Sequence, residues 1–289
     1  MALRASSDSS GVPPGGVALL DAGVRRRLEQ FGRWTTDRPA PGAEGFRRAP
    51  VATWDAADLR FDPGAGWSGS AWPVEPWTVD IDGLTLELRP TASGGLGLYP
   101  EHAANVGWLG GQVAARTGSP APPSVLNLFA HTGLATLALA RAGAQVTHVD
   151  GSRATIGWAR RNAELSDLAD RPIRWIVDDV GAFVAREARR GRRYDGIVLD
   201  PPAFGRGRGR EWRLDTDLLG LLRACRAIAA DDAFILLTAH SESVDGEALG
   251  AMLAAAFETR PGLVDTTPLS LTAASGVTLS LGWAARIGA

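Results

Sequence analysis

Residues 124–151 read SVLNLFAHTGLATLALARAGAQVTHVDG, and the rest of the chain can be interpreted from them. The short apolar run 125–129 is rich in β-branched and aromatic residues, which predicts a strand buried on both faces. After a turn at 130–133, residues 134–142 are suited to a helix packed on a sheet and ended by Gly143. Residues 145–149 predict a second strand, which stops at Asp150. A strand, a glycine turn, a helix, a strand and an acid form the opening unit of a doubly wound nucleotide-binding sheet.

The turn in this unit predicts an adenosine-type cofactor. It presents backbone N–H groups at a helix N-terminus, and Gly133 lets a ligand approach the backbone closely. Asp150 follows Gly133 by 17 positions (150 − 133), near the roughly 20-residue offset at which a carboxylate accepts hydrogen bonds from ribose hydroxyls. The turn lacks the three glycines of a dinucleotide fingerprint, and a chain without lysine has no P-loop. S-adenosyl-L-methionine (SAM), which has a ribose but no phosphate, fits best. The alternative is that the unit serves only the fold.

The composition limits the class of protein. A chain of 289 residues can hold one large α/β domain and a smaller module. The net charge of −2 gives no overall nucleic-acid signature, so any RNA contact must rest on local patches. A single cysteine, Cys225, excludes a disulfide framework and a cysteine-cluster metal site, and no metal site is predicted. No apolar run approaches the roughly 18 residues that span a bilayer, so we expect a cytoplasmic protein with no membrane partner.

The N-terminal third differs in composition from the rest. Residues 1–17 are aperiodic and rich in Pro and Gly, which predicts a disordered leader. Residues 18–93 predict a small β module. Within it, residues 28–34 are expected to be the last part of a short helix. Residues 77–88 alternate around Asp82-Gly83, which is typical of a β-hairpin. The tryptophans of this module either fill a small core or stack on a nucleobase. They are Trp34, Trp54, Trp67, Trp72 and Trp77.

Residues 94–289 are expected to form the main domain. A glycine-rich loop enters it, and the loop's residues Tyr99, Glu101 and His102 either contact the cofactor or cap and pack the following helix. Residues 153–165 predict a helix and residues 172–177 a third strand, followed by Asp178-Asp179. An acid at this edge of the sheet can accept a hydrogen bond from the adenine amino group. Asp179 is preferred, but both acids remain candidates.

A rigid acidic corner is expected after the fourth strand, residues 194–199. It is Asp200-Pro201-Pro202, in which each proline fixes φ and lacks an N–H, so that carbonyl groups point into the cleft. A carboxylate and carbonyl oxygens suit the amino or ring N–H of a planar base, held in line with a methyl donor. The alternative is a proline turn that serves only the fold.

The chain beyond this corner predicts a cationic loop and the end of the sheet. Gly and Arg alternate over 205–210 before Trp212, giving either a lip that contacts phosphate or an ordinary solvated loop. The candidate substrate-binding residues are Phe204, Arg206, Arg208 and Arg210. Helices at 217–229 and 246–258, a strand at 233–239 and an antiparallel pair at 263–271 and 277–284 are expected to follow. The predicted fold class is therefore α/β, with a Rossmann-like doubly wound seven-stranded sheet whose last strand is antiparallel.

Five motifs in this order give a family resemblance: LNLFAHTG, HVDGS, ARRNAEL, VDDV and YDGIVLDPPAFGRG. Over residues 77–240 they resemble the class I SAM-dependent methyltransferases of the RlmI-like (YccW-type) family, whose known members modify large-subunit ribosomal RNA. The resemblance implies SAM as cofactor, RNA as substrate, and contacts from Asp150 to the ribose and Asp179 to the adenine. The cofactor-binding set is Asn127, Phe129, Ala130, Thr132, Gly133, Asp150, Gly151, Ser152, Asp178, Asp179 and Asp200. The catalytic set is Asp200, Pro201 and Pro202.

The chain departs from this family in two places. Members that methylate carbon 5 of cytosine carry a cysteine just after the fifth strand, where this chain reads TAHSES at 238–243. Attack by a thiolate is needed to activate that carbon, and Cys225 is expected to be buried on a helix face. Direct transfer to a nitrogen is therefore favoured. The family's N-terminal RNA-binding PUA module is replaced by the tryptophan-rich segment, so a methyltransferase acting on a small molecule or protein and a non-catalytic SAM- or RNA-binding protein remain alternatives.

Overall fold

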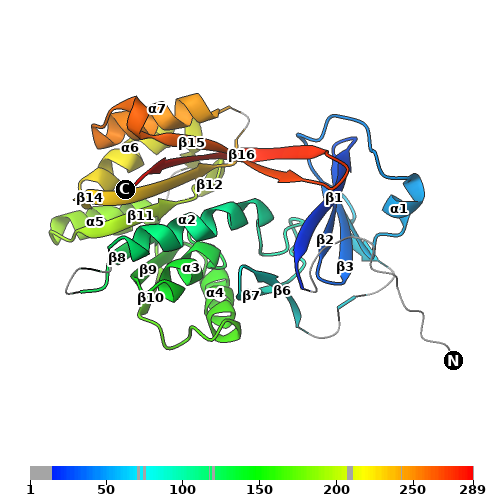
Figure 1. Ribbon diagram of the computed structural model, residues 1–289, viewed down its shortest axis with the longest axis horizontal. Helices are drawn as coiled ribbons and strands as arrows, with labels where there is room; N and C mark the ends of the chain where they lie inside the picture. The colour runs from blue at the N-terminus through cyan, green and yellow to red at the C-terminus, as the bar shows by residue number, and fades with distance from the viewer. Residues whose placement is uncertain are drawn as a thin grey trace.

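A computed structural model describes residues 15–69, 72–73, 76–116, 118, 121–206, 211–241 and 243–288. The chain forms a five-stranded sheet near the N-terminus and a larger seven-stranded sheet covered by helices (Figure 1). The smaller sheet lies beside one end of the larger one, and the last two strands of the chain reach from the larger sheet to the smaller (Figure 1). Among the described residues, no helix combines the length and the apolar character needed to span a bilayer.

The seven-stranded sheet confirms the predicted fold class. Its strands are β8 (Ser124–Leu128), β9 (Gln145–Asp150), β10 (Ile173–Val177), β11 (Tyr194–Leu199), β14 (Ala229–Ala239), β15 (Asp265–Thr272) and β16 (Thr278–Ile287). Their order is β10-β9-β8-β11-β14-β16-β15; the first five are parallel, and β16 is antiparallel to both of its neighbours. The order reverses at β8, which pairs with β9 on one side and β11 on the other. A ligand crevice is expected there, outside the carboxyl ends of the strands.

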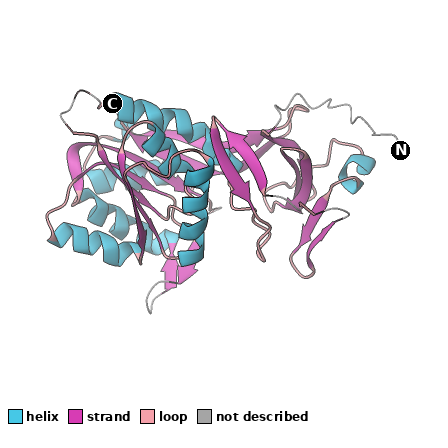
Figure 2. Cartoon of the chain, turned by 90° about the horizontal axis from the view of Figure 1, so that it is seen from below, coloured by secondary structure: helices cyan, strands magenta, loops and turns pink. Residues whose placement is uncertain are grey.

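Helices cover both faces of this sheet (Figure 2). Two large apolar clusters lie on opposite sides of the sheet, and each contains side chains from the helices on its own side. One face carries α2 (Ala103–Ala114), α3 (Leu134–Arg141) and α4 (Arg153–Leu165); the other carries α5 (Val180–Arg189), α6 (Leu214–Arg226) and α7 (Gly246–Phe257). The central strands β8 and β11 are buried along most of their length and are largely apolar, as expected for parallel strands covered on both faces.

The smaller sheet contains β1 (Val17–Gly23), β2 (Arg26–Phe31), β3 (Trp34–Pro39), β4 (Leu59–Asp62) and β5 (Gly66–Gly69), with α1 (Val51–Asp55) between β3 and β4. The helix expected at 28–34 is wrong, because β2 and β3 form a hairpin there. Both faces of this hairpin carry buried charged groups: Glu29 pairs with Arg38 on one face, and Asp37 pairs with two arginines on the other. These ion pairs hide the apolar alternation that identifies a strand in a sequence.

Of the residues expected to form the leader, 1–17, only residues 15–17 belong to the described part of the chain. Residues 1–14 lie outside the described part of the chain, but the carbonyls of Gly15 and Gly16 accept hydrogen bonds from the backbone of Asp80 and Gly32. Residues 15–17 are therefore held against neighbouring strands. Of the five tryptophans in this region, Trp54 and Trp77 are fully buried and Trp72 is 47% exposed.

The hairpin predicted around Asp82-Gly83 is confirmed as β6 (Trp77–Ile81) and β7 (Leu84–Leu88). Both turn residues have positive φ, 52° and 76°, as a tight two-residue hairpin requires. This hairpin packs against α3 and α4 of the larger domain. The C-terminal hairpin joins the two sheets: Leu279 and Ala273 at its tip share an apolar cluster with Leu19 of β1 (Figure 1).

Candidate active site

Two adjoining cavities lie at the carboxyl ends of β8, β9 and β11. The larger has a volume of about 1000 Å³ and the smaller about 60 Å³. The larger is large enough for a nucleoside-sized ligand. Four residues line both cavities: Tyr99, Phe129, His131 and Asp200.

The loop that follows β8 has an unusual backbone. Phe129 and His131 have positive φ of 54° and 48°, and Gly133, which precedes α3, has φ 96°. Non-glycine residues adopt this conformation only where the surroundings enforce it, and such positions cluster at binding sites. The Thr132 hydroxyl donates to the Gly97 carbonyl, and Asn162 donates to the Thr132 carbonyl, so neighbouring segments hold the loop on two sides.

Asp150 links this loop to the end of β9. Its carboxylate oxygens accept hydrogen bonds from the backbone N–H of His131 (2.9 Å) and of Ser152 (2.9 Å). The side chain is half-buried and faces the larger cavity. A carboxylate offers about four acceptor positions, so two fixed bonds orient it and leave capacity for the hydroxyls of a ribose. The site therefore fits an adenosyl ligand.

The two acids after β10 both line the larger cavity and both have structural partners. Asp178 pairs with Arg186, while Asp179 caps α5 by accepting the N–H of Ala182 (2.9 Å). Neither arrangement distinguishes the acid that would accept from an adenine amino group.

A buried polar chain supports the loop from below. The Asn127 amide donates to the Thr136 hydroxyl (2.8 Å), which lies 2.9 Å from Nδ1 of His148. Burial lowers the pKa of His148 to about 3, so this ring is neutral at physiological pH. Asn127, which lines the smaller cavity, is therefore held in place by uncharged side chains.

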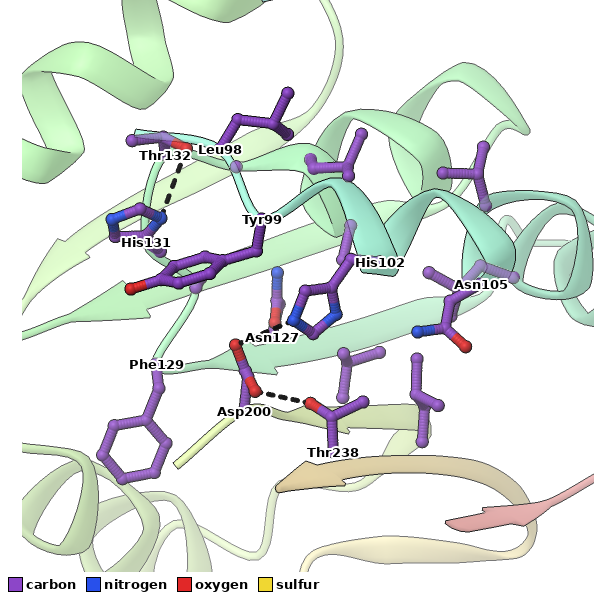
Figure 3. A pocket seen from close by; sticks show the side chains of 18 of the residues that line it. Leu98, Tyr99, His102, Asn105, Asn127, Phe129, His131, Thr132, Asp200 and Thr238 are labelled. Atoms are coloured by element: carbon purple, nitrogen blue, oxygen red, sulfur yellow. Dashed lines mark hydrogen bonds and ion pairs between the residues drawn. The ribbon is translucent and has the colours of Figure 1, made fainter. Parts of the chain in front are cut away.

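The Asp200 carboxylate faces polar groups from two segments, the residues just before α2 and the end of β14; Figure 3 shows His102 and Thr238 beside it. The Thr238 hydroxyl donates to Oδ1 (2.6 Å); Nε2 of His102 lies 3.4 Å from Oδ2, and Nε2 of His240 lies 3.5 Å from Oδ1. Burial alone raises the pKa of Asp200, but the two histidines and Thr238 outweigh it and hold the pKa well below its usual range. Asp200 is therefore ionised.

The histidines come from distant parts of the chain. His102 ends the 3₁₀ helix η1 (Pro100–His102), and His240 follows β14. Their Nε2 atoms lie 2.9 Å apart, and Nδ1 of His240 donates to the Leu281 carbonyl (2.8 Å). Burial alone lowers the pKa of His240, but its hydrogen bond to Asp200 and the charges of Asp200 and Glu101 raise it to about 9.

A short hairpin of β12 (Phe204–Arg206) and β13 (Glu211–Arg213) lies beside the proline corner. The Trp212 indole donates to the Pro202 carbonyl (2.7 Å), and its ring centroid lies 5.7 Å from that of Phe129. One of the carbonyls expected to face the cleft is therefore already occupied by a protein donor.

The structure brings most of the sequence-predicted residues together around the two cavities. The residues that line them are Asn127, Phe129, Ala130, Thr132, Gly133, Asp150, Gly151, Asp178, Asp179, Asp200, Pro201 and Pro202. Ser152 lines neither cavity; its hydroxyl caps α4 by accepting the N–H of Thr155. Phe204 lines neither and is 73% exposed. Arg206 is described only in its backbone, and Arg208 and Arg210 lie outside the described residues.

Sequence reasoning missed His131, Thr238 and His240 as site residues. All three line one or both of the cavities and follow or end strands whose carboxyl ends meet at this edge of the sheet. For His131 the motif LNLFAHTG was a usable signal, whereas Thr238 and His240 could be found only from the strand order.

Comparison with solved structures identifies the family. A SAM-dependent methyltransferase from Agrobacterium tumefaciens is 35% identical with a TM-score of 0.86, over 95% of this chain and 90% of that chain. A candidate SAM-dependent methyltransferase from Streptococcus mutans shares the fold at 15% identity and a TM-score of 0.72, over 96% of this chain and 76% of that chain. No protein-family model matches the chain.

Curated relatives match part of the chain. Ribosomal RNA large subunit methyltransferase K/L of Syntrophotalea carbinolica is 41% identical over 93 residues, which cover 32% of this chain and 13% of that protein. Ribosomal RNA large subunit methyltransferase I of Aeromonas salmonicida is 28% identical over 155 residues, which cover 53% of this chain and 35% of that protein. The matches thus span about a third or less of these relatives' lengths. With the close likeness to the Agrobacterium enzyme along nearly all of both chains, they show that this chain belongs to the SAM-dependent methyltransferases.

Proposed function

We propose that this methyltransferase transfers the methyl group of SAM to a nitrogen of an RNA base, with large-subunit ribosomal RNA as the favoured substrate. The observation that carries the proposal is the position of Asp200-Pro201-Pro202, which follows β11 and lines the cavity beside the loop 129–133. The names of the curated relatives, all of which describe ribosomal RNA large subunit methyltransferases, support RNA as the substrate.

We assign the cofactor contacts to the polar groups around the loop. Asp150 would hold the ribose hydroxyls through the acceptor capacity that its two backbone bonds leave free. Asn127, Thr132 and Gly133 would surround the methionine end, and Asp178 or Asp179 would accept from the adenine amino group. When bound, SAM supplies an electrophilic methyl group. The protein's part is to orient the target and exclude water.

The target would enter as an unpaired or flipped base. The rings of Tyr99, Phe129 and Trp212 line the larger cavity and offer surfaces for stacking. The ionised Asp200 would accept a hydrogen bond from the target's N–H and so direct its lone pair to the methyl group.

Nitrogen is favoured over carbon 5 of cytosine because the site lacks a thiolate. Burial raises the pKa of Cys225 to about 12, and this residue lies within the apolar cluster beneath α6. A thiol in that environment stays protonated and inert. A base nitrogen already has a lone pair and needs no covalent activation.

Residues 18–93 and 94–289 would act as a small β module and a methyl-transfer domain. Arg206, Arg208 and Arg210 would contact phosphate next to the cavity, as a local patch on a chain without overall positive charge. Such an enzyme is expected in the cytoplasm, where ribosomal RNA is modified.

The proposal is tested with methyl-labelled SAM and RNA from cells that lack this gene. We expect label in one nucleoside of ribosomal RNA, carried on a nitrogen. Asp200→Ala should lower transfer at least 100-fold while SAM affinity stays within a few-fold, and the exposed variant Asp231→Ala should behave like the wild type. Label found only in protein or small molecules would exclude RNA, and loss of both SAM binding and transfer in Asp200→Ala would indicate a folding role.

A further inference from the structure

Two imidazoles and a carboxylate converge on one point beside the proline corner. One nitrogen from each ring and one oxygen of Asp200 lie within 4.8 Å of one another. The two Nε2 atoms are 2.9 Å apart. The two rings face different oxygens of Asp200: His102 lies 3.4 Å from Oδ2, and His240 lies 3.5 Å from Oδ1. Figure 3 shows the His102 ring directed at Asp200.

The hydrogen bonding of His240 determines which of its nitrogens faces the cluster. A carbonyl oxygen only accepts, so the bond from Nδ1 of His240 to Leu281 fixes a proton on Nδ1. A metal cation at Nε2 would displace the second proton of this ring, and the lone pair that is then free is directed at His102. Two ring nitrogens at 2.9 Å cannot face each other with lone pairs alone, so a proton or a metal cation must lie between them.

We propose that His102, Asp200 and His240 bind one divalent transition-metal cation of the Zn²⁺ class. Metal–ligand bonds of about 2.0–2.1 Å place neighbouring ligand atoms roughly 3.0–3.4 Å apart. The two Nε2 atoms, 2.9 Å apart, are close to this spacing. One oxygen of Asp200 lies within 4.8 Å of both, so the carboxylate has to turn toward the two rings to complete the set. Two histidines and a carboxylate also form a recurring set for Zn²⁺ and Fe²⁺ with an open position.

The surroundings of the three ligands favour a cation as well. Ligating histidines in metal sites usually donate their second N–H to a carbonyl or carboxylate, and ligating carboxylates are themselves hydrogen-bonded. Here Nδ1 of His240 donates to the Leu281 carbonyl and also lies 3.6 Å from Oε1 of Glu101. The Asp200 carboxylate accepts a hydrogen bond from the Thr238 hydroxyl. Glu101 is buried, and its Oε2 has no hydrogen-bond partner among the described residues. The carboxylates of Asp200 and Glu101 beside the two rings place negative charge where a divalent cation would sit.

The site is compatible with methyl transfer at the same corner. Three protein ligands leave at least one coordination position, which can face the cavity that Asp200 and His240 line. A carboxylate has about four acceptor positions; Thr238 and the cation would use two, which leaves acceptors for a target N–H. This cation site was not expected from the sequence, because its histidines are 138 residues apart.

The test is a Co²⁺ titration of tag-free, chelator-treated protein, without SAM or RNA, so that its outcome does not depend on the proposed function. We expect visible absorption bands that saturate at one equivalent of Co²⁺ and disappear when Zn²⁺ is added. His102→Gln and His240→Gln should each weaken Co²⁺ binding about 100-fold. His131→Gln is the matched control, because it removes a histidine from the same cavity but outside the cluster, and it should bind like the wild type.

The absence of bands in the wild type would overturn the proposal, as would binding that survives the double variant His102→Gln/His240→Gln. Thermal unfolding followed by circular dichroism shows whether each variant is folded. If the variants do not fold, crystals of the wild type soaked in Zn²⁺ decide the matter: an anomalous peak between the three side chains supports the site, and a peak elsewhere or none refutes it.

Discussion

Asp150 is the residue on which cofactor binding is expected to depend most. Its carboxylate is held by two backbone N–H groups at the edge of the larger cavity. Asp150→Ala would remove both the ribose acceptor and the support of the loop, so we expect SAM affinity to fall at least tenfold by isothermal titration calorimetry. The exposed variant Asp170→Ala should keep the wild-type affinity. Unchanged affinity in Asp150→Ala would refute the ribose assignment.

Cys225 is predicted to be dispensable for methyl transfer. Its thiol is fully buried, and burial raises its pKa to about 12. Cys225→Ala should therefore keep its transfer rate within a few-fold, at a stability cost of about 1 kcal/mol. Iodoacetamide should label the thiol only after unfolding in urea. Loss of transfer in a folded Cys225→Ala protein would revive a covalent mechanism at carbon.

His148 should make the protein sensitive to acid. Its pKa is about 3 in the folded chain, against 6.5 when exposed, because burial disfavours the charged ring. Stability is therefore full above pH 6.5 and decreases as the pH falls towards 3, since only the unfolded chain binds the proton. Between pH 7 and pH 5, the free energy of unfolding should fall by about 2 kcal/mol for this reason.

Urea unfolding at pH 7 and pH 5 measures this effect. Between pH 7 and pH 5, the free energy of unfolding of His148→Gln should fall by about 2 kcal/mol less than that of the wild type. Thr136→Val removes the hydrogen-bond partner of His148 but keeps the titrating ring, so it should retain the steep dependence. Equal losses in the wild type and His148→Gln would show that this ring does not titrate as its burial implies.

Among the elements, the hairpin β12–β13 is expected to support the proline corner. The Trp212 indole N–H is bonded to the Pro202 carbonyl, and its ring packs on Phe129. Trp212→Phe keeps a ring and removes one hydrogen bond, worth about 1 kcal/mol, so transfer should fall about fivefold with SAM affinity within twofold. Trp212→Ala removes both contacts, so its rate of methyl transfer should fall further. A transfer rate unchanged in both variants would exclude this role.

Much of the main domain could be predicted from the sequence because its local signals agree. Apolar runs, Gly143 after α3 and the proline pair after β11 mark the ends of elements, and β16 completes the sheet as expected. The hairpin β2–β3 could not be predicted, because its buried positions carry Glu29 and Asp37 in ion pairs and mask the alternation. Strand patterns fail where charged groups are buried in pairs.

The site could be predicted where its residues stand next to a motif. Asp150 and Asp200 end their strands and line the expected crevice. His102 and His240 could not be paired in this way, because only the sheet topology brings η1 and the end of β14 together across Asp200. Ser152, next to Asp150, caps α4 and lines neither cavity, and its contact with the cofactor stays a prediction.

At the scale of the whole molecule, the last two strands of the chain connect the two sheets. The C-terminal hairpin β15–β16 belongs to the seven-stranded sheet, yet its tip packs on β1 (Figure 1). The cavities lie instead at the carboxyl ends of β8, β9 and β11, within the main domain. Both cavities are thus built on the larger sheet.

The most direct test of this account is a crystal structure of the chain with S-adenosylhomocysteine. We predict the ribose hydroxyls within about 3.2 Å of the Asp150 carboxylate, the amino-acid end against Thr132 and Gly133, and the sulfur facing the Asp200-Pro201-Pro202 corner. A nucleoside bound outside this cavity, or a sulfur directed away from Asp200, would contradict the account.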